Sequence, residues 1–298
     1  MGTHDGWRHS PAETLRVGPG FVLDDLDPSS TPGWHGDKHD AEREMRRRGR
    51  DLERLQEQLF AAGKEGDTRS VLLVLQGMDS AGKGGIVSHV VGLVNPQGVR
   101  ITGFGVPTEE EKKHHYLWRI RNALPPAGKL GVFDRSHFEQ VLVVRVHNLV
   151  PRETWEKHYD ELNAFEAELA AAGTTVVKVA LVISPEEQLE RLGDRLEDPG
   201  KYWKYNPKDL DERGLWNEYR AAYQAMFDRC SPATAPWYAV PADRKWYARL
   251  AVTEILTNAL EGLDLAWPAA QFDVEAERSR ISSLDPSAPE APRATEAS

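Results

Sequence analysis

Blocks of apolar residues, separated by polar and turn-rich segments, predict strands and helices in alternation along this chain. The uninterrupted apolar run Val71–Leu75 is typical of a central strand that is buried on both faces, here over residues 70–76. Shorter apolar runs, bounded by glycine, proline or charged residues, predict four further strands. These are expected at 99–104, 130–134, 175–183 and 237–240.

Helix signals fill the segments between these strands. Thr108 and Glu111 match the capping-box pattern at a helix start, and Ser184 and Glu187 match it again. Helices are expected at 37–62, 86–93, 108–124 and 151–172, from 185, from 206 and at 243–263. Strands that alternate with helices indicate an α/β fold, with a mostly parallel sheet of about five strands and helices on both faces.

Composition divides the chain into a central domain and two ends. Residues 1–40 carry seven acids and three bases, and residues 269–298 carry six acids and three bases, so most of the net charge of −10 lies at the ends. Both ends are rich in Pro, Ser, Gly and Ala, which is typical of poorly ordered segments. We expect an extended N-terminal arm over 1–36, one domain over 37–268 and a disordered C-terminal tail over 269–298.

A glycine-rich segment directly follows the predicted central strand. Residues 77–83 match the G-x-x-x-x-G-K pattern of a phosphate-binding loop (P-loop), with a helix expected right after it. Backbone N–H groups of such a loop bind phosphate oxygens, and the lysine adds a mobile positive charge. The predicted phosphate ligands are Gly77, Gly82, Lys83, Gly84 and Gly85. The alternative, a glycine-rich turn with a surface lysine, is disfavoured by the strand–loop–helix context.

The loop departs from the usual pattern at Gly84, where a Ser or Thr normally binds Mg²⁺. A carboxylate is a suitable replacement ligand, and Asp79 within the loop is the first candidate. The second candidate is Asp134, which ends the strand at 130–134, where an acid can bind a metal or position water. Asp134 could instead cap the helix that follows, and the two roles are compatible.

Basic residues on other segments extend the predicted phosphate site. Arg135 follows at the carboxyl end of a central strand, where open α/β sheets bind ligands. Arg119 is a further candidate for binding phosphate. For Arg135 the alternative is a surface salt bridge.

The segment 185–206 is predicted to form a lid that closes over phosphates. Arg191 and Arg195 lie one helical turn apart, and Lys201 and Lys204 follow in an exposed loop. The two arginines are expected on a different face from an apolar stripe that would pack on the protein. That stripe consists of Leu189, Leu192 and Leu196. Acids interleaved with these bases leave a merely solvated helix as the alternative.

Together these segments resemble the polyphosphate kinase 2 family over about residues 37–263, and within it the class III type. The resemblance rests on Val74–Gly85, Asn95–Arg100, Phe133–Val146, Ala235–Tyr238 and Pro241–Tyr247. It implies a three-layer P-loop kinase-like fold with a helical lid. It also implies transfer of phosphate from inorganic polyphosphate to ADP and AMP, with Mg²⁺ as cofactor and Mn²⁺ as a possible substitute. The family further implies a homo-oligomer, either a dimer or a tetramer.

The resemblance also implies roles for individual residues. The expected catalytic residues are Asp79, Lys83, Asp134, Arg135, Arg191 and Arg195, with Asp79 and Asp134 as the metal ligands. Phosphate is expected to contact Arg119, Lys201 and Lys204 as well as the loop. The nucleotide is expected to contact Arg135, Glu139 and Gln140. Asp134 stands where Asn is usual in class III and Gln140 where Asp is usual, which bears on nucleotide preference rather than on the reaction.

Other features narrow the choice of function. The single cysteine, Cys230, excludes an internal disulfide, and the chain shows neither a signal peptide nor a membrane span, which favours a cytoplasmic protein. Nucleic-acid binding is disfavoured because no segment combines a basic excess with exposed aromatic residues. The aromatic residues recur at helical spacing and are assigned to the core, Tyr219 and Tyr223 among them. An ATP-dependent nucleoside monophosphate kinase and a non-enzymatic nucleotide-binding switch protein remain the alternatives.

Overall fold

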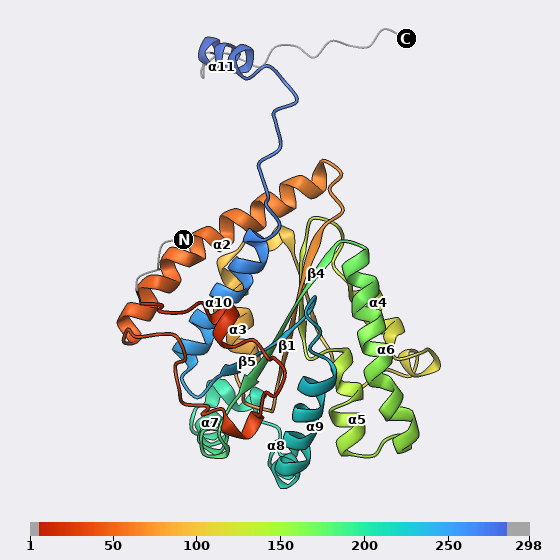
Figure 1. Cartoon of the computed structure of the whole chain (residues 1–298). Coiled ribbons are helices and arrows are strands. Elements are labelled where there is room, and N and C mark those ends of the chain that lie inside the picture. Colours follow the sequence, from red (N-terminus) through yellow and green to blue (C-terminus); the bar gives the residue numbers. More distant parts are fainter. Residues whose placement is uncertain (1–5, 285–298) are drawn as a thin grey trace.

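Five parallel strands form one sheet in the order β2-β3-β1-β4-β5, shown in Figure 1. The computed structural model describes residues 6–284. The strands are β1 (Ser70–Gly77), β2 (Val99–Gly103), β3 (Leu130–Asp134), β4 (Thr174–Val182) and β5 (Trp237–Pro241). All five predicted strands are therefore present, and the predicted α/β fold with a parallel sheet is confirmed.

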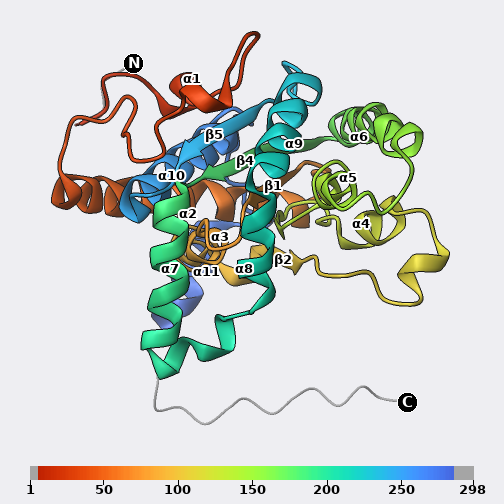
Figure 2. The same ribbon diagram turned by 90° about the horizontal axis from the view of Figure 1, so that it is seen from below.

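The central strand β1 carries side chains into both faces of the sheet. Val71, Leu73 and Leu75 pack in one core, with α2 (Lys38–Lys64), α3 (Lys83–His89) and α10 (Lys245–Glu261). Leu72 and Val74 pack in the other core, with α4 (Leu117–Ala123), α6 (Arg152–Ala171) and α9 (Trp216–Arg229). Figures 1 and 2 show the resulting three layers, with helices on both sides of the sheet. Because successive side chains of β1 point to opposite faces of the sheet, this one strand contributes to the core on both sides.

Strand register brings two predicted segments to the same edge. Leu75 pairs with Asp134 on β3, and Gly77 pairs with Leu181 on β4. The backbone N–H of Arg135 donates to Leu75 O at 3.0 Å, which continues the β1–β3 pairing into the loop. The P-loop and the segment that begins with Arg135 therefore leave the sheet side by side, as expected for the carboxyl ends of parallel strands.

Short helices cover this carboxyl edge. The elements are α5 (Val143–Val146), α7 (Pro185–Glu197) and α8 (Lys208–Glu212), with 3-10 turns at His137–Gln140, Pro199–Lys204 and Arg213–Leu215. α7 and α8 lie at the lower end of Figure 1, where β4 leads into α7. Further 3-10 turns cover Leu23–Asp25, Val91–Leu93, Pro96–Gly98 and Glu111–Lys113.

Two long predicted helices are interrupted. The Thr108–Glu111 capping box forms as predicted, but it opens only a 3-10 turn, and α4 starts afresh at Leu117. The predicted helix from residue 206 is split into α8 and α9 by the turn that contains Gly214, a poor helix former. The predicted helix at 86–93 likewise ends at His89.

The N-terminal arm is packed on the domain. Trp7, Leu15 and Trp34 are buried in the core beside α2 and α10. Val17 N–H donates to Trp237 O at 2.8 Å, and Ala239 N–H donates to Leu15 O at 2.9 Å, so the arm pairs with β5 at the edge of the sheet. Covering an exposed strand edge in this way prevents other chains from pairing with it. Within the described part of the arm, residues 6–36, the regular elements are α1 (Pro11–Thr14) and one 3-10 turn.

The prediction of a disordered tail over 269–298 is wrong for part of that range. Val274–Ser283 form α11, whose N-cap Asp273 accepts hydrogen bonds from the N–H groups of Glu275 and Ala276. Ion pairs one turn apart, Glu275–Arg278 and Glu277–Arg280, add support. This stretch has no proline or glycine, unlike its surroundings. Residues 285–298 lie outside the described residues. None of the helices in 6–284 combines the length and apolarity needed to cross a membrane.

A buried arginine joins α2 to α10. Arg48 Nε donates to both carboxylate oxygens of Glu254, at 3.0 and 2.9 Å, and both side chains are almost wholly buried. The same guanidinium reaches Glu261, Asp51 and Asn258. A buried charge is tolerated only when it is fully paired, so this cluster fixes how the two helices pack.

Removing Glu254 should therefore destabilise the fold strongly. Glu254→Leu leaves the Arg48 charge buried without its closest partner, and we expect the free energy of unfolding to fall by about 3–5 kcal/mol. Glu42→Leu is the control, since Glu42 is exposed and lies 3.9 Å from Lys38, and it should change stability by less than about 1 kcal/mol. Urea unfolding at pH 7 measures both values. Equal losses in the two variants would contradict the role given to the cluster.

Candidate active site

The P-loop adopts a backbone shape that few residues can follow. Gly77 and Gly82 have φ values of 154° and 112°, and Ser80 has a φ of 65°. A Cβ on Gly77 would also lie 2.9 Å from Leu181 O, too close for any side chain. A non-glycine residue at positive φ costs about 1–3 kcal/mol, so surrounding contacts must hold the loop.

The side chain of Arg191 supplies two of these contacts and links the loop to other segments. Its Nη1 donates to Ser80 O at 2.9 Å and to Ala81 O at 3.0 Å. Its Nη2 donates to the carbonyl oxygens of Ala242 and Asp243, beyond β5. Its Nε donates to Glu187 on the same helix at 2.7 Å. Arg191 thus joins the P-loop to the turn after β5 and to the start of α7.

This arrangement corrects the predicted orientation of the lid helix. Arg191 is only 6% exposed, whereas Leu189 and Leu196 of the expected apolar stripe are 53% and 51% exposed, and only Leu192 is buried. The inward face is instead formed by Gln188, Arg191 and Leu192. Periodicity alone could not reveal that four carbonyl oxygens, two in the P-loop and two after β5, accept hydrogen bonds from this arginine, because those acceptors come from remote segments.

Lys83 lies inside the loop, as predicted. Its ammonium donates to Gly77 O at 2.6 Å and to Met78 O at 3.4 Å. Burial, together with the nearby charge of Arg135, lowers the pKa of Lys83 below its usual value. A lysine held in this way favours the approach of an anion, which would restore the charge balance around it.

Arg135 and Asp79 form an ion pair across the site. Arg135 Nη2 donates to Asp79 Oδ1 at 2.8 Å, although the two residues start from different strands. Arg135 also has a positive φ of 63°, a strained conformation of the kind that clusters at active sites. Gln188 secures the other side of Asp79, since its Nε2 donates to Asp79 O at 2.9 Å. An ion pair thus joins the P-loop to the end of β3, two segments that were both expected to contribute to the phosphate site.

Glu139 completes the charged part of the site. It accepts a hydrogen bond from Gln76 Nε2 at 3.1 Å. Burial raises the pKa of Glu139 above its usual value, against the opposing effect of Arg135. Its carboxyl group is therefore more easily protonated than that of an exposed glutamate.

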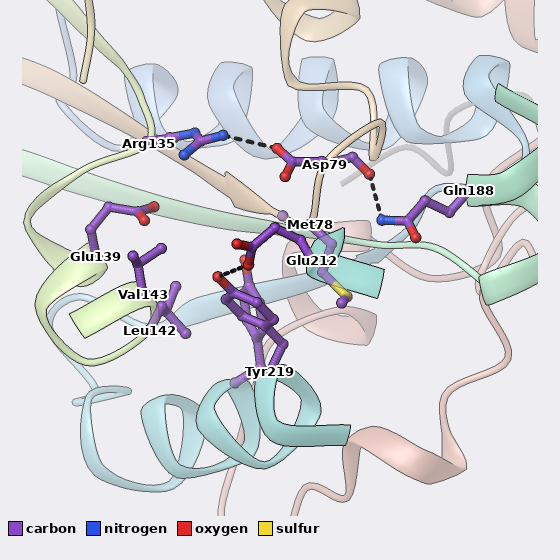
Figure 3. Close-up of a pocket in the computed structure, with 11 residues that line it drawn as sticks. Met78, Asp79, Arg135, Glu139, Leu142, Val143, Gln188, Glu212 and Tyr219 are labelled. Carbon is purple, nitrogen blue, oxygen red and sulfur yellow. Dashed lines mark hydrogen bonds and ion pairs between the residues drawn. The ribbon is translucent and has the colours of Figure 1, made fainter. Parts of the chain in front are cut away.

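A cavity opens between these groups and α9 (Figure 3). One end carries the charges of Asp79, Arg135 and Glu139, and the other end is apolar and aromatic. The lining consists of Gly77, Met78, Asp79, Arg135, Glu139, Leu142, Val143, Gln188, Glu212, Tyr219 and Tyr223. A charged end beside an apolar slot matches a ligand with phosphates at one end and a flat ring at the other.

Glu212 projects into the apolar end, and two donors hold it there. Tyr219 Oη donates to Glu212 Oε2 at 2.7 Å, and His147 Nε2 lies 3.0 Å from the same oxygen. Burial and the bond to Glu212 raise the pKa of Tyr219, so its hydroxyl stays a donor. Within residues 6–284, Glu212 Oε1 has no hydrogen-bond partner, which leaves an acceptor for a ligand.

Sequence reasoning missed this part of the cavity. Tyr219 and Tyr223 were assigned to the core because they recur at helical spacing, yet both line the cavity. Gln188 and Glu212 carry no motif that could have marked them. Only the position of α9 across the carboxyl edge of the sheet brings these side chains to the P-loop.

Other predicted residues lie away from the cavity lining. Asp134 acts on Lys83 and Arg135 electrostatically but does not line the cavity. Its alternative role as helix cap is wrong, because Ser136 Oγ accepts from Phe138 N–H instead. Gln140 is half-buried, and its backbone carbonyl oxygen lies 3.5 Å from His158 Nδ1.

Three predicted phosphate ligands, Arg119, Lys201 and Lys204, and the predicted catalytic residue Arg195 lie elsewhere. Arg119 donates to Gly105 O beside β2. Arg195 donates to Lys204 O and to Asp209, which ties the parts of the lid segment together. Lys201 pairs with Asp198 at 3.0 Å, and Lys204 lies over the Trp203 ring. These three lid residues would have to move to reach the P-loop.

A metal ion fits the site only together with a substrate. Within residues 6–284, no three His, Cys, Asp or Glu side chains are grouped to hold a metal by themselves. Mg²⁺ is commonly bound by one or two carboxylates plus substrate phosphates and water. Asp79 meets this requirement, because it lines the cavity and its Oδ2 has no hydrogen bond among the described residues.

Comparison with known proteins agrees with this geometry. The polyphosphate kinase 2 family matches residues 35–266. The AMP/ADP-polyphosphate phosphotransferase of Meiothermus ruber is 46% identical over 248 residues, which cover 83% of this chain and 91% of that protein. The ADP-polyphosphate phosphotransferase of Rhodopseudomonas palustris is 37% identical, over 85% of this chain and 91% of that protein.

A solved structure agrees as well. The crystal structure of polyphosphate kinase 2 from Arthrobacter aurescens TC1 superposes with a TM-score of 0.90 at 52% identity, covering 93% of this chain and 98% of that one. The family match over residues 35–266 includes the P-loop and the lid segment. This chain therefore belongs to the polyphosphate kinase 2 family.

Proposed function

We propose that this protein transfers phosphate from inorganic polyphosphate to ADP and AMP and so forms ATP. One observation carries the proposal: a P-loop lies beside a cavity that is charged at one end and apolar at the other. The loop suits a chain of phosphates, and the cavity suits a nucleotide that accepts the transferred group. Relatives named as polyphosphate phosphotransferases for AMP, ADP or both support the choice of substrates.

The assignment to class III, with both AMP and ADP as acceptors, is part of this proposal. It is supported by the 46% identical relative, which is named for both nucleotides. We also propose a cytoplasmic homo-oligomer, either a dimer or a tetramer. The single cysteine, Cys230, is buried and free, which suits a reducing compartment.

The reaction needs alignment and charge more than covalent help. The P-loop amides and Lys83 hold the donor phosphates, and Arg135 faces the acceptor phosphates from the cavity wall. Because Arg135 pairs with Asp79, both charges are already oriented before a substrate binds. Mg²⁺ or Mn²⁺, bound through Asp79 and the phosphates, would supply further positive charge, and Asp134 would support Lys83 or the metal.

A covalent enzyme intermediate is not expected. His137 is bonded to Glu166, but both side chains are almost wholly buried, and Glu166 also pairs with Lys178. This network lies in the core and offers no face to the cavity, so direct transfer between the two substrates remains the simplest route.

The donor can be tested directly. With Mg²⁺ and inorganic polyphosphate as the only source of phosphate, ADP should yield ATP, and AMP should yield ADP and then ATP. Chromatography of the nucleotides measures the products. Lys83→Ala should lower kcat/KM by about a hundredfold or more, since it removes a charge aimed at the transferred group. If phosphate passes only from ATP to a monophosphate, the protein is instead an ATP-dependent kinase.

Substitution of the two lid arginines should have different effects on the melting temperature of the protein. Arg191→Ala removes a buried guanidinium and five hydrogen bonds, so both the melting temperature and kcat/KM should fall, the latter by about a hundredfold or more. Arg195→Ala should leave the melting temperature within a few degrees, because its side chain is partly exposed. It should still lower kcat/KM if Arg195 meets the phosphates when the lid closes. Calorimetry measures the melting temperatures, and initial rates give kcat/KM. An unchanged melting temperature in Arg191→Ala would contradict the role of Arg191 in supporting the P-loop.

The acceptor site predicts a role for Glu212. Glu212→Gln keeps the shape but weakens a hydrogen bond from the nucleoside, so KM for ADP should rise about tenfold, equivalent to about 1.4 kcal/mol, with little change in kcat. Tyr219→Phe should have a smaller effect in the same direction. Glu218→Gln, on an exposed part of α9, is the matched control and should leave KM unchanged. Equal KM values in Glu212→Gln and the control would remove Glu212 from the nucleotide site.

A further inference from the structure

A charged network is buried in the core behind the cavity. Lys178 on β4 is wholly buried, and its ammonium donates to Glu166 on α6 and to Cys230 O, the latter at 2.8 Å. The second carboxylate oxygen of Glu166 lies 3.2 Å from His137 Nε2. A carboxylate only accepts, so the imidazole donates this hydrogen bond. His137, Glu166 and Lys178 thus form one buried network that runs from β4 through α6 to the turn after β3.

Stability alone does not account for charges at this place. The surroundings are aromatic: the rings of Phe138 and Trp237 lie 5.1 and 5.4 Å from the Lys178 ammonium, and the Phe165 ring packs edge-on against His137. Burying an ion pair in such surroundings costs solvation free energy, and apolar residues of similar volume are often at least as stable. His137 Nδ1 is also buried without a hydrogen-bond partner in residues 6–284, which adds to the cost. The segments that the network joins offer another explanation.

One end of the network holds the turn that follows β3. His137 stands between Arg135 and Glu139 in the chain, and both of these neighbours line the cavity. On the side of β1 the turn is held by Gln76, whose Nε2 donates to Glu139 at 3.1 Å. The bond from His137 to Glu166 holds the side that faces α6. Because Arg135 has a positive φ, the turn depends on such contacts to keep its shape.

The other end of the network holds α9. Cys230 is the C-cap of this helix, and its carbonyl oxygen accepts the hydrogen bond from Lys178. A cation is favourable there because the last carbonyl groups of a helix carry partial negative charge. Tyr219 and Tyr223 on the same helix line the aromatic end of the cavity. One ammonium group is therefore bonded, directly or through Glu166, to the segments that carry both ends of the cavity.

From these contacts we propose that His137, Glu166 and Lys178 are positioning residues for phosphate transfer, which hold Arg135 and Glu139 in register with the aromatic wall of the cavity. This inference rests on the proposed function. Among residues 6–284, the cavity lining includes none of the three, so they act through the segments that they hold and not on a substrate. A small displacement of Arg135 would misalign the acceptor phosphates, and the rate of group transfer depends steeply on such alignment.

Two substitutions of His137 separate positioning from packing. His137→Gln keeps an N–H donor for Glu166, whereas His137→Phe keeps a ring beside Phe165 and removes the donor. With saturating polyphosphate and Mg²⁺, His137→Phe should lower kcat/KM for ADP about tenfold or more. His137→Gln should stay within about threefold of the wild type, because the bond to Glu166 is kept. Equal values in the two variants, or a more active His137→Phe, would overturn the inference, since ring packing would then explain the histidine.

A second experiment replaces the whole network by apolar residues. The triple variant His137→Phe, Glu166→Leu and Lys178→Met removes both charges together, so neither is left buried alone, and the melting temperature should stay within a few degrees of the wild type. Its kcat/KM for ADP should nevertheless fall at least as far as in His137→Phe. A triple variant with wild-type stability and wild-type kcat/KM would overturn the inference. If the triple variant does not fold, the two single variants of His137 carry the test.

His114→Phe is the matched control, because His114 also contacts a glutamate, Glu110, but at an exposed position outside the cavity lining. It should leave both kcat/KM and the melting temperature unchanged. A wild-type protein that uses no polyphosphate would instead refute the proposed function. The positioning role would then be tested by the affinity for ADP, which titration calorimetry measures without a donor. His137→Phe should bind ADP more weakly than His137→Gln, and equal affinities would overturn the inference.

Discussion

The active site depends on one buried arginine beneath a strained loop. Arg191 donates to two P-loop carbonyl oxygens, to two carbonyl oxygens in the turn after β5, and to Glu187 on its own helix. The loop needs this support because it holds glycines and Ser80 at positive φ. The same bonds fix the start of α7, and α7 lies between the cavity lined by Tyr219 and a second space at the starts of α2 and α10. One side chain therefore couples the loop shape to the layout of both spaces.

Three cations around the loop lack a full set of anions. Lys83 bonds only to carbonyl oxygens, Arg135 shares Asp79, and Arg249 has no acid partner among the described residues. Such under-neutralised cations are costly in an empty site and favourable once phosphates bind. The packing of the sheet, in which β1 is almost wholly buried, offsets the free energy that these cations cost the folded protein. The stability of the core thus permits a site whose cations are only partly neutralised.

Agreement between sequence and structure was closest where the signal is local. The buried run of β1, the P-loop and the strand end at Asp134 follow from short stretches of sequence, and all lie where predicted. Errors arose where a side chain chooses between partners from remote segments. The leucine stripe of α7 suggested one orientation, and the carbonyl oxygens around Arg191 impose another. Tyr219 and Tyr223 repeat with the period of core residues, although they face the cavity. The spacing of apolar residues along a helix indicates which side chains share a face, but it does not indicate what that face contacts.

The sequence by itself determined the fold class, the phosphate-binding loop and the family, because each is encoded in contiguous residues whose chemistry is read directly. Tertiary structure alone decided which charges meet. It paired Asp79 with Arg135, placed Arg191 beneath the loop rather than on the lid surface, and left Lys201 and Lys204 away from the cavity. It also brought Glu212 to the aromatic end of the cavity and Arg249 to Gly85. These contacts depend on the packing of whole helices across the sheet, and the energy of a charge depends on all its neighbours at once.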